Sequence, residues 1–285
     1  MNDIKFVADI GSNHNRNFAR CLKLIDAAKD MGCWGVKIQI FQADKLYAKG
    51  YIPNDFERQI FPISWTYKVA DYCKQKNIKF GGTPFDLEAA RTLNYYADFM
   101  KISSFDILRL DLIKACIQPN KELIISTGMA IPEEILNTRK LINKNILIPK
   151  HIYYLHCISD YPTKPEDCKL GNIKALKNLF NYHEYYNTKV GWSDHTQDIN
   201  TLYKAQMQGA EMIEFHIDLD DQLGYESING HCYTPKMMGK TIYNILKIES
   251  TIDIQYWNPL TPEMINKRNF RADPADGLRP MRKIR

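Results

Sequence analysis

Eight short β-rich runs alternate with amphipathic, helix-like segments along the chain, and this alternation predicts an α/β protein of the TIM (β/α)8 barrel class. A length of 285 residues fits a barrel that folds as a single domain. A doubly wound sheet is the competing interpretation, but it usually has fewer strands and a glycine-rich first turn. The first turn here reads ADIGSNHNR, which is not a GxGxxG pattern. We therefore predict the barrel, followed by a short C-terminal tail.

The predicted strands are runs rich in Val, Ile, Phe and Tyr, residues that favour extended backbone. In chain order they cover 5–10, 34–40, 78–85, 98–104, 122–128, 151–159, 189–195 and 211–217. The helical pattern between them is clearest over 17–32, 63–77, 132–145 and 234–250. Residues 41–62 form an unusually long connection, and loops of this length in compact domains are often functional. The predicted boundaries are 1–250 for the barrel and 251–285 for the tail.

The composition excludes several classes of protein. Hydrophobic residues make up 45% of the chain, and no apolar run approaches the ~18 residues of a membrane span. The N-terminus, MNDIKFVADIGSN, lacks the basic region and apolar stretch of a secretory signal. Seven cysteines without paired spacing indicate reduced thiols, so we expect a cytoplasmic protein without a membrane partner. Much of the net charge of +5 lies in the tail RPMRKIR, with no groove-reading motif, so we expect no nucleic acid partner.

Polar and aromatic residues occur where the predicted strands end. Because the reacting groups of TIM barrels lie at the carboxyl ends of the strands, these residues are the candidates for an active site. They include Asp9, Lys37, Gln39, Thr83, Phe85, Lys101, Ser104, Ser126, Ser159, Tyr161, Ser193, His195 and His216.

Two lysines, Lys37 and Lys101, lie on strands that are otherwise mainly apolar. A buried ammonium group needs an anionic partner. One interpretation is a pair of internal salt bridges, with Asp9 or Asp106 as the partners. The interpretation that we favour is a cradle for a phosphate and a carboxylate, which implies a small, multiply charged anion as the ligand. Neutral donors in that cradle would be the hydroxyl groups of Thr83, Ser104, Ser126 and Ser193.

The segment VGWSDHTQDIN places Ser193, Asp194 and His195 side by side. A hydrolase triad is not favoured, because neighbouring residues on a strand point to opposite faces and a triad needs its members to converge. The residues after His195 fit an ordinary helix cap. His195 and His216 end neighbouring strands and bring two imidazoles to one rim, which favours a site for divalent manganese, zinc or iron over two structural histidines. Ser193 would then face the substrate.

Eight segments resemble, in order and spacing, the sialic acid synthase family, which includes the N-acetylneuraminate, pseudaminic acid and legionaminic acid synthases. The segments are ADIGSNHNR, GVKIQIFQADKLY, GGTPFDLEAA, MKISSFDI, IISTGMA, LHCISDYPTKPED, GWSDHT and GAEMIEFHIDLD. The resemblance runs from about residue 5 to residue 220.

The resemblance implies a TIM-barrel enzyme that condenses phosphoenolpyruvate with an open-chain amino sugar such as N-acetylmannosamine, releases phosphate, and uses a divalent metal, usually manganese. Carried over by position, the metal ligands are His195 and His216. The side chains that line the sugar are Gln39, Phe85 and Tyr161. The contacts to phosphoenolpyruvate fall on Lys37, Thr83, Lys101, Ser104, Ser126 and Ser193.

Four positions depart from the family pattern. Asp9 stands where the family carries Glu, and Arg16 stands where Gly usually closes the same motif. Ser159 replaces an Asn that some members carry. GYE replaces GPD after the last strand, so that Glu226 takes the place of an Asp that contacts the sugar. We therefore expect intact chemistry on phosphoenolpyruvate and altered recognition of the sugar.

The antifreeze-like domain, which in many members follows the barrel and lends an arginine to the neighbouring subunit's site, has no counterpart in the sequence. We expect the pocket to be completed by the loop 41–62 or by the basic tail, in the same subunit or across a homodimer. The cationic and aromatic side chains available there are Lys45, Tyr47, Arg58, Arg268, Arg271 and Arg279.

Two alternatives remain. One is condensation of phosphoenolpyruvate with a different aldose, as in the octulosonate phosphate synthases. The other is a catalytically inactive barrel that acts as a binding protein, which the full set of Lys37, Lys101, His195 and His216 argues against.

Overall fold

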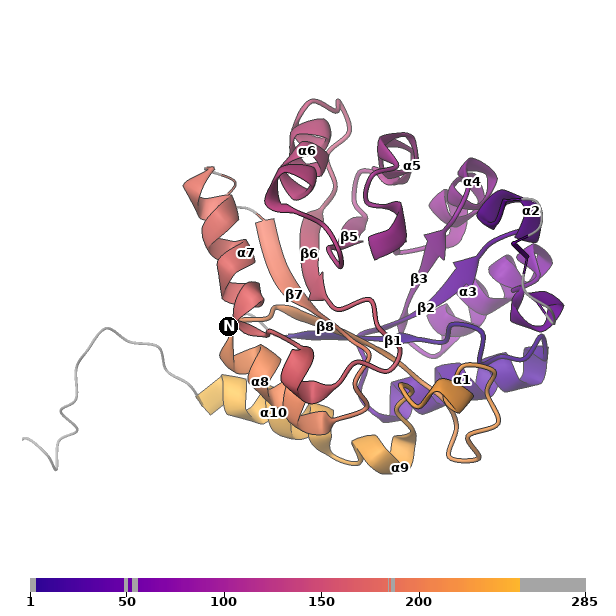
Figure 1. The fold of residues 1–285 in the computed structure, drawn as a ribbon. Coiled ribbons are helices and arrows are strands. Elements are labelled where there is room, and N and C mark those ends of the chain that lie inside the picture. Colours follow the sequence, from indigo (N-terminus) through magenta and orange to yellow (C-terminus); the bar gives the residue numbers. More distant parts are fainter. Residues whose placement is uncertain (1–3, 49–50, 53–55, 184, 186–187, 252–285) are drawn as a thin grey trace, which may run out of the picture. The chain divides into compact units, whose positions relative to one another are not determined.

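The structure, a computed structural model, describes residues 4–48, 51–52, 56–183, 185 and 188–251. Its eight parallel strands form a closed barrel in chain order, with β8 pairing back onto β1 (Figure 1). The TIM barrel is therefore confirmed, and every predicted strand overlaps an observed one, with both ends within two residues. The strands are β1 (Lys5–Asp9), β2 (Gly35–Ile40), β3 (Lys79–Pro84), β4 (Phe99–Ile102), β5 (Glu122–Ser126), β6 (His151–Cys157), β7 (Thr188–Asp194) and β8 (Met212–His216).

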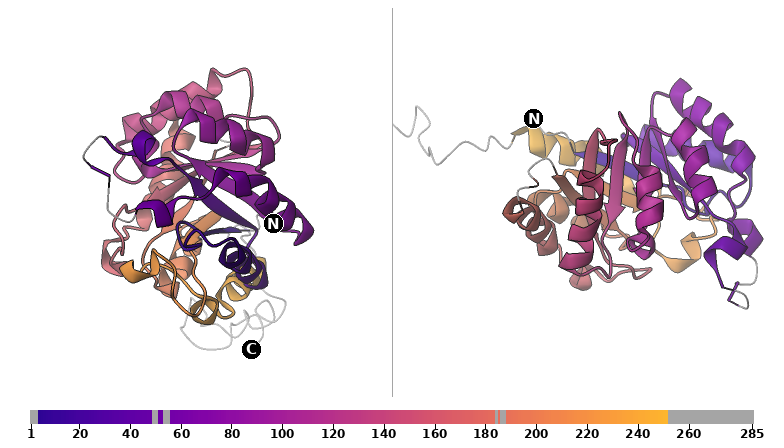
Figure 2. Two further views of the ribbon diagram at one scale, coloured as in Figure 1. Left: turned by 90° about the vertical axis from the view of Figure 1, so that its right-hand side faces the viewer. Right: turned by 90° about the horizontal axis from the view of Figure 1, so that it is seen from above.

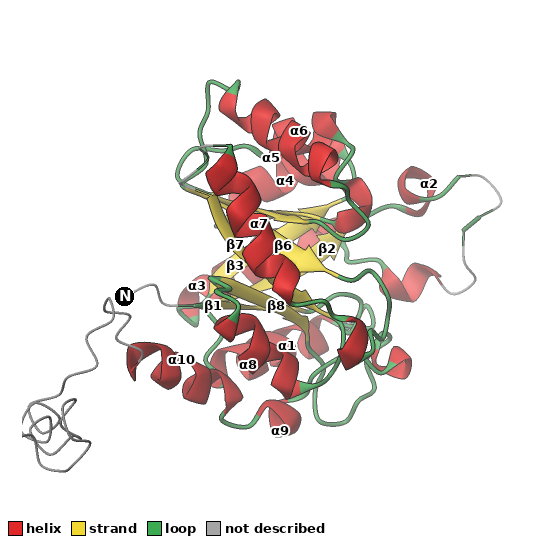
Figure 3. Ribbon diagram, turned by 60° about the vertical axis from the view of Figure 1, so that its left-hand side comes forward, coloured by secondary structure: helices red, strands yellow, loops and turns green. Residues whose placement is uncertain are grey.

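Helices surround the strands on the outside of the barrel (Figures 2 and 3). They are α1 (Phe18–Asp30), α2 (Ala43–Leu46), α3 (Thr66–Gln75), α4 (Leu87–Tyr96), α5 (Leu110–Cys116), α6 (Pro132–Asn143), α7 (Gly171–Tyr182), α8 (Ile199–Met207), α9 (Pro235–Met238) and α10 (Thr241–Thr251). Short 3-10 helices lie in the loops: η1 (Phe56–Gln59), η2 (Ile63–Trp65), η3 (Ser104–Asp106), η4 (Pro165–Asp167) and η5 (Ser227–Asn229). Within the described residues, no helix has the length and apolar character to cross a membrane.

The C-terminal part of the barrel differs from its predicted form. A single helix is expected over 234–250, but Gly239 adopts a φ of 45° and a ψ of −118°, which separates α9 from α10. The chain divides into a unit of Met1–Glu249 and a unit of Ser250–Arg285. Residues 252–285 of the predicted tail, which include Arg268, Arg271 and Arg279, lie outside the described residues.

The alternation of side chains along the strands places polar residues above an apolar layer inside the barrel. Residues two apart on a strand point to the same side. The interior layer nearer the amino ends of the strands is the apolar cluster of Val7, Phe99, Ile124, Tyr153, Leu155 and Met212. Two residues further along the same strands come the polar residues Asp9, Lys101, Ser126, Cys157 and Glu214. The apolar cluster is therefore the floor on which the polar residues of the mouth stand.

This floor requires a glycine in β3. A Cβ atom on Gly81 would lie only 2.1 Å from the ring of Phe99, which fills that space. Such an overlap is far inside van der Waals contact, so the aromatic floor and Gly81 depend on each other.

The helices are held by ordinary caps and by an outer core. Asp86 begins α4 by accepting hydrogen bonds from the backbone N–H groups of Glu88 (2.8 Å) and Ala89 (2.9 Å). The buried faces of the helices pack on the outward side chains of the strands in a second, larger apolar cluster.

Candidate active site

A cavity of about 480 Å³ opens at the carboxyl end of the barrel. All of the predicted site residues except Ser159 line it. Its wall consists of Asp9, Ser12, Lys37, Gln39, Phe41, Leu46, Tyr47, Phe56, Gln59, Thr83, Phe85, Lys101, Ser103, Ser104, Phe105, Asp106, Ser126, Cys157, Tyr161, Ser193, His195, Glu214, His216 and Glu226. Residues from all eight strands and from the loops that follow them thus meet in one polar space.

Lys37 lies on one side of this cavity, paired with Asp9. Its ammonium contacts the Asp9 carboxylate and the Thr83 hydroxyl (3.3 Å), and Gln39 donates to the same carboxylate (2.9 Å). Burial opposes both charges, but Asp9 and Glu214 outweigh it and raise the pKa of Lys37. For Asp9 burial is likewise outweighed, by Lys37 and His216, so that its pKa is lowered. The pair is therefore ionised and pre-positioned.

Lys101 forms a second pair, but its partner is not Asp106. Its ammonium donates to Glu214 (2.9 Å), and the Ser193 hydroxyl donates to the same oxygen (3.0 Å). Burial would raise the pKa of Glu214, but Lys101 and Lys37 lower it. The salt-bridge interpretation of the two lysines is thus correct for Asp9 and wrong for Asp106, while both ammonium groups still face the cavity.

Asp106 and the hydroxyl groups contribute buried polar atoms that lack a partner. Within the described part of the chain, Asp106 Oδ2 and the hydroxyls of Ser126 and Ser159 accept and donate no hydrogen bond. Burial raises the pKa of Asp106 to about 6, against a smaller opposing effect of Arg109. Buried polar atoms are rarely left unsatisfied, so Asp106 and Ser126, which line the cavity, point to a polar ligand.

Ser104 and Ser159 flank the turn after β5. The Ser104 hydroxyl accepts a hydrogen bond from Gly128 N–H (3.0 Å), and a Cβ on Gly128 would come within 2.3 Å of the Ser159 hydroxyl. Ser159 therefore packs against Gly128, and it is not part of the cavity wall.

A second side of the cavity, next to Asp9, carries imidazole rings. The ring centroids of His195 and His216 lie 5.3 Å apart, and Tyr161 packs on His195 at 4.0 Å. His195 Nδ1 lies 2.8 Å from the carbonyl oxygen of Ile158, and His216 Nδ1 lies 2.6 Å from Glu226 Oε2. In both rings the Nδ1 atom is therefore engaged within the protein. The other ring nitrogen of His216, Nε2, lies 3.5 Å from Asp9 Oδ2.

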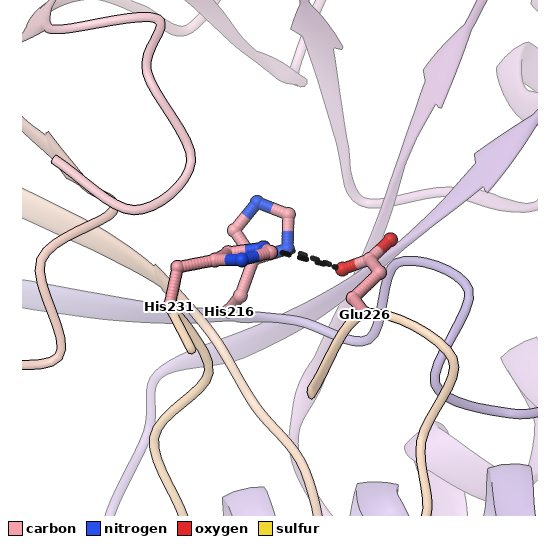
Figure 4. A group of neighbouring side chains, drawn as sticks. All are labelled: His216, Glu226 and His231. Atoms are coloured by element: carbon pink, nitrogen blue, oxygen red, sulfur yellow. Dashed lines mark hydrogen bonds and ion pairs between the residues drawn. The ribbon is translucent and has the colours of Figure 1, made fainter. Parts of the chain in front are cut away.

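Glu226 is held from three directions. Its Oε1 accepts a hydrogen bond from Ser12 N–H (2.7 Å), and its Oε2 faces both His216 and His231 (Figure 4). Burial would raise the pKa of this carboxyl, but His216 and His231 depress it strongly. The same interaction raises the pKa of His216, because Asp9 and Glu226 outweigh the effect of burial. Both oxygens of Glu226 are engaged within the protein.

Three residues, Asp106, Glu214 and His231, were assigned no substrate-binding or metal-binding role from the sequence. Glu214 and Asp106 were visible near strand ends, but the sequence does not show which carboxylate pairs with which lysine. His231 lies 15 residues beyond His216 in a loop and carried no periodic signal. The available clue was a histidine after the positive-φ residue Gly230, a position that turns the chain sharply.

The donor set fits a divalent transition metal. Imidazole nitrogens and carboxylates suit manganese, iron or zinc, and a ligating histidine usually donates its other N–H to a carboxylate or carbonyl. His195 and His216 have this arrangement, through Ile158 and Glu226. His216, Glu226 and His231 each offer a ligand atom, and these three atoms lie within 4.8 Å of one another.

The loop 41–62 contributes aromatic and amide groups to the cavity. Tyr47, Phe56 and Gln59 line it, whereas Lys45 pairs with Glu88 (2.7 Å) outside it and Arg58 is not part of the wall. The expectation that this loop shapes the pocket is met, but within the described residues it supplies no cation to the wall.

Asp194 removes the triad interpretation of the SDH segment. Its carboxylate accepts hydrogen bonds from Thr196 N–H (2.6 Å), the Thr201 hydroxyl (2.6 Å) and the Tyr233 hydroxyl (3.0 Å), all outside the cavity. Ser193 and His195 point inward, as alternation on a strand requires.

The fold and the site define a TIM-barrel protein whose mouth combines two paired lysines with a histidine cluster. The family model for the NeuB family matches residues 24–253, so the chain belongs to the NeuB family.

Individual relatives agree with this assignment. The chain is 32% identical to the N,N'-diacetyllegionaminic acid synthase of Campylobacter jejuni over 78% of its own length and 70% of that relative's length. It is 27% identical to the pseudaminic acid synthase of Helicobacter pylori over 77% and 67% of the two chains. The crystal structure of the sialic acid synthetase of Leptospira borgpetersenii, in complex with citrate, superposes with a TM-score of 0.83 at 27% identity, covering 93% of this chain and 91% of that one.

Proposed function

We propose that this protein condenses phosphoenolpyruvate with an open-chain amino sugar such as N-acetylmannosamine to give a nonulosonic, sialic-type acid and phosphate. One observation carries the proposal: two buried lysines and two inward imidazoles line a single cavity. A site with cations on one side and metal-ligating nitrogens on the other suits an anionic substrate that must meet a carbonyl compound. The names of the relatives support the same class of product.

The protein's own groups hold the anionic substrate. Lys37 and Lys101 would contact its phosphate and carboxylate, and the buried hydroxyls would donate the neutral hydrogen bonds. The hydroxyl donors are Thr83, Ser104, Ser126 and Ser193. A divalent metal, for which we propose manganese at His195 and His216, supplies Lewis acidity toward the sugar aldehyde. Gln39, Phe85 and Tyr161 would then orient the sugar.

The reaction balances with water as the third reactant. C3 of phosphoenolpyruvate bonds to the aldehyde carbon, whose oxygen takes up a proton and becomes a hydroxyl. Water adds at C2 and loses a proton, and the C2–O bond to phosphate breaks. Asp106, whose pKa is raised to about 6 by burial, is suited to exchange a proton near neutral pH.

Charge balance gives a physical reason for the metal. In the interior, Lys37 and Lys101 are offset by Asp9 and Glu214, so the two pairs together are neutral. Glu226 adds a negative charge beside His216. An anion therefore enters a space that is not strongly cationic, and a dication would supply the missing positive charge. We expect phosphoenolpyruvate to bind more tightly when the metal is present.

The setting of the reaction is part of the proposal. All seven cysteines are buried free thiols, which suits a reducing cytoplasm. We also propose a homodimer, in which the partner or the basic tail would cover the part of the cavity near Gln39, Phe85 and Tyr161, where the sugar would bind.

The test is release of inorganic phosphate from phosphoenolpyruvate, measured with manganese over a panel of N-acetylated hexoses, free hexoses and phosphorylated pentoses. We expect turnover with an N-acetylated amino sugar, and loss of turnover with chelator. Turnover only with a phosphorylated pentose would show that the proposed amino sugar is the wrong acceptor. No phosphate release with any aldose would reject the proposed synthase activity.

A further inference from the structure

We propose that His231 is a third histidine ligand of the divalent metal that His195 and His216 hold, and that Glu226 is the carboxylate that positions the His216 and His231 rings for it. The inference rests on the proposed function only for the presence of the metal. It assigns His231, which neither the sequence pattern nor the family resemblance singled out.

The spacing of the three rings fits one shared ion. Imidazoles that bind a single ion at nitrogen–metal distances of about 2.1 Å place their ring centroids roughly 5 Å apart. The centroids of His216 and His231 lie 4.8 Å apart, those of His195 and His216 lie 5.3 Å apart, and those of His195 and His231 lie 6.2 Å apart. A movement of about 1 Å by His231 would equalise the triangle, which is within the reach of a side-chain adjustment.

His231 also carries an unused ligand atom. It is 2% exposed, and its Nδ1 has no hydrogen-bond partner within the described part of the chain. His14 likewise has an unpartnered Nε2, but its ring packs edge-on against Phe61 and Trp65. Around His231 the neighbouring groups are instead Tyr161, His216 and Glu226. A buried nitrogen among such groups is typical of a ligand rather than of a core side chain.

Glu226 links two of the rings. Its Oε2 lies 2.6 Å from His216 Nδ1 and 3.8 Å from His231 Nε2 (Figure 4). This single carboxylate oxygen faces one nitrogen of each imidazole and fixes the orientation of both rings. The other nitrogen of each ring is then left for a metal.

Backbone hydrogen bonds hold His231 beside the end of β8. Gly230 turns the chain with a φ of 74°, and the next residues pair with the end of β8. Tyr233 N–H donates to the His216 carbonyl, and Asp218 N–H donates to the Tyr233 carbonyl, each at 2.8 Å. The segment around His231 is therefore fixed to the strand that carries His216.

The experiment measures metal binding directly, in the full-length protein with manganese alone. The variants are H231A, H231Q and E226Q, with H195A and H216A as ligand controls and H183A as a matched surface control. Manganese affinity is measured by electron paramagnetic resonance. Ligating imidazoles are counted by spin-echo spectroscopy in protein labelled with 15N-histidine.

We expect three coordinated imidazoles in the wild type and in H183A, and two in H231A and H231Q. Manganese affinity should fall by about 100-fold or more in H231A and H231Q. In E226Q, where three imidazoles remain, it should fall by about 10–100-fold. Wild-type affinity and nitrogen count in folded H231A and H231Q would overturn the inference, while loss of metal in H195A and H216A would leave the proposed function standing. Conversely, three imidazoles without metal-dependent phosphate release would uphold the inference and reject the function. A wild type that binds no manganese would reject the site.

Discussion

The two sides of the cavity are built differently. Lys37 and Lys101 project from β2 and β4, and each charge pair joins two strands of the same barrel. On the other side, only His195 and His216 come from the end of the strands β7 and β8, whereas Glu226 and His231 lie in the loop between β8 and α9. The lysine side is thus positioned by the barrel itself, and the histidine side depends on how a long loop is attached.

The attachment runs through buried hydrogen bonds to the loop after β1. Asn13 donates to the Ile217 carbonyl and accepts from Glu226 N–H, each at 2.8 Å. Arg20 pairs with Asp218 and Asp221. The comparison teaches that loop mutations should leave anion binding at the lysine side intact, whereas removal of a charged group should abolish it. At the histidine side, metal binding should be lost when a mutation displaces the loop.

The largest effect is expected for Lys101→Ala. The change removes the close partner of the buried Glu214 and leaves Lys37, at 3.9 Å, as the nearby cation. We therefore expect a loss of about 3 kcal/mol in the free energy of unfolding and a strong rise in the phosphoenolpyruvate KM. Urea denaturation and phosphate-release kinetics measure the two effects. The double variant K101A/E214Q should regain stability but not activity. If K101A changes only the sugar KM, the substrate halves have been assigned the wrong way round.

Asn13→Ala should break the histidine side alone. It leaves the Ile217 carbonyl and Glu226 N–H without partners, which costs about 2–4 kcal/mol of stability. Manganese affinity should fall while the phosphoenolpyruvate KM, measured at saturating manganese, changes little. Calorimetric titration with manganese and kinetics at saturating metal separate the two sides. Equal damage to both would show that the sides are not independent.

These two tests mark what the sequence could predict. The barrel follows from the eight-fold alternation, and the period of two brings Asp9, Lys37, Lys101 and Ser193 to one interior layer without further information. The identity of Lys101's partner could not be predicted, because Asp106 and Glu214 both stand near strand ends and only the register of the closed barrel separates them.

The histidine side was predicted only in part. His195 and His216 follow from strand ends, but Glu226 and His231 reach them through a loop whose path is set by long-range contacts such as Asn13 to Ile217. Periodicity is silent about such loops, because their conformation is determined by individual hydrogen bonds.

Removal of metal should have an intermediate effect on the histidine side. A ligand present at 100 times its Kd stabilises the folded state by about 2.7 kcal/mol. We therefore expect manganese to raise the melting temperature of the wild type, and chelator to reverse the rise. His195→Ala should melt at the same temperature with and without manganese. A manganese-dependent shift that survives in the H195A/H216A double variant would place the metal elsewhere.

The smallest expected effect is the dependence of stability on pH that comes from His14, in the loop after β1. Burial lowers the pKa of His14 to about 4, so between pH 6.5 and pH 4 the unfolded chain binds a proton that the folded chain does not. Stability should therefore fall as the pH drops, by about 2 kcal/mol for this group at pH 5 relative to pH 8. In His14→Asn, whose side chain is able to accept from Arg16 N–H as His14 Nδ1 does, this part of the pH dependence should vanish. An unchanged difference between urea midpoints at pH 8 and pH 5 would contradict the assignment.

The aromatic floor beneath the cavity affects the order in which molecules bind and leave. Phe99 and its neighbours in the apolar cluster close the barrel below Lys101, so that in the described part of the chain the cavity exchanges its contents through the mouth. The molecule that enters first lies deepest and must leave last. In the proposed condensation, two substrates and two products would share this one opening, which imposes an order of binding and release. The product that leaves last should then compete with the first substrate for the empty protein.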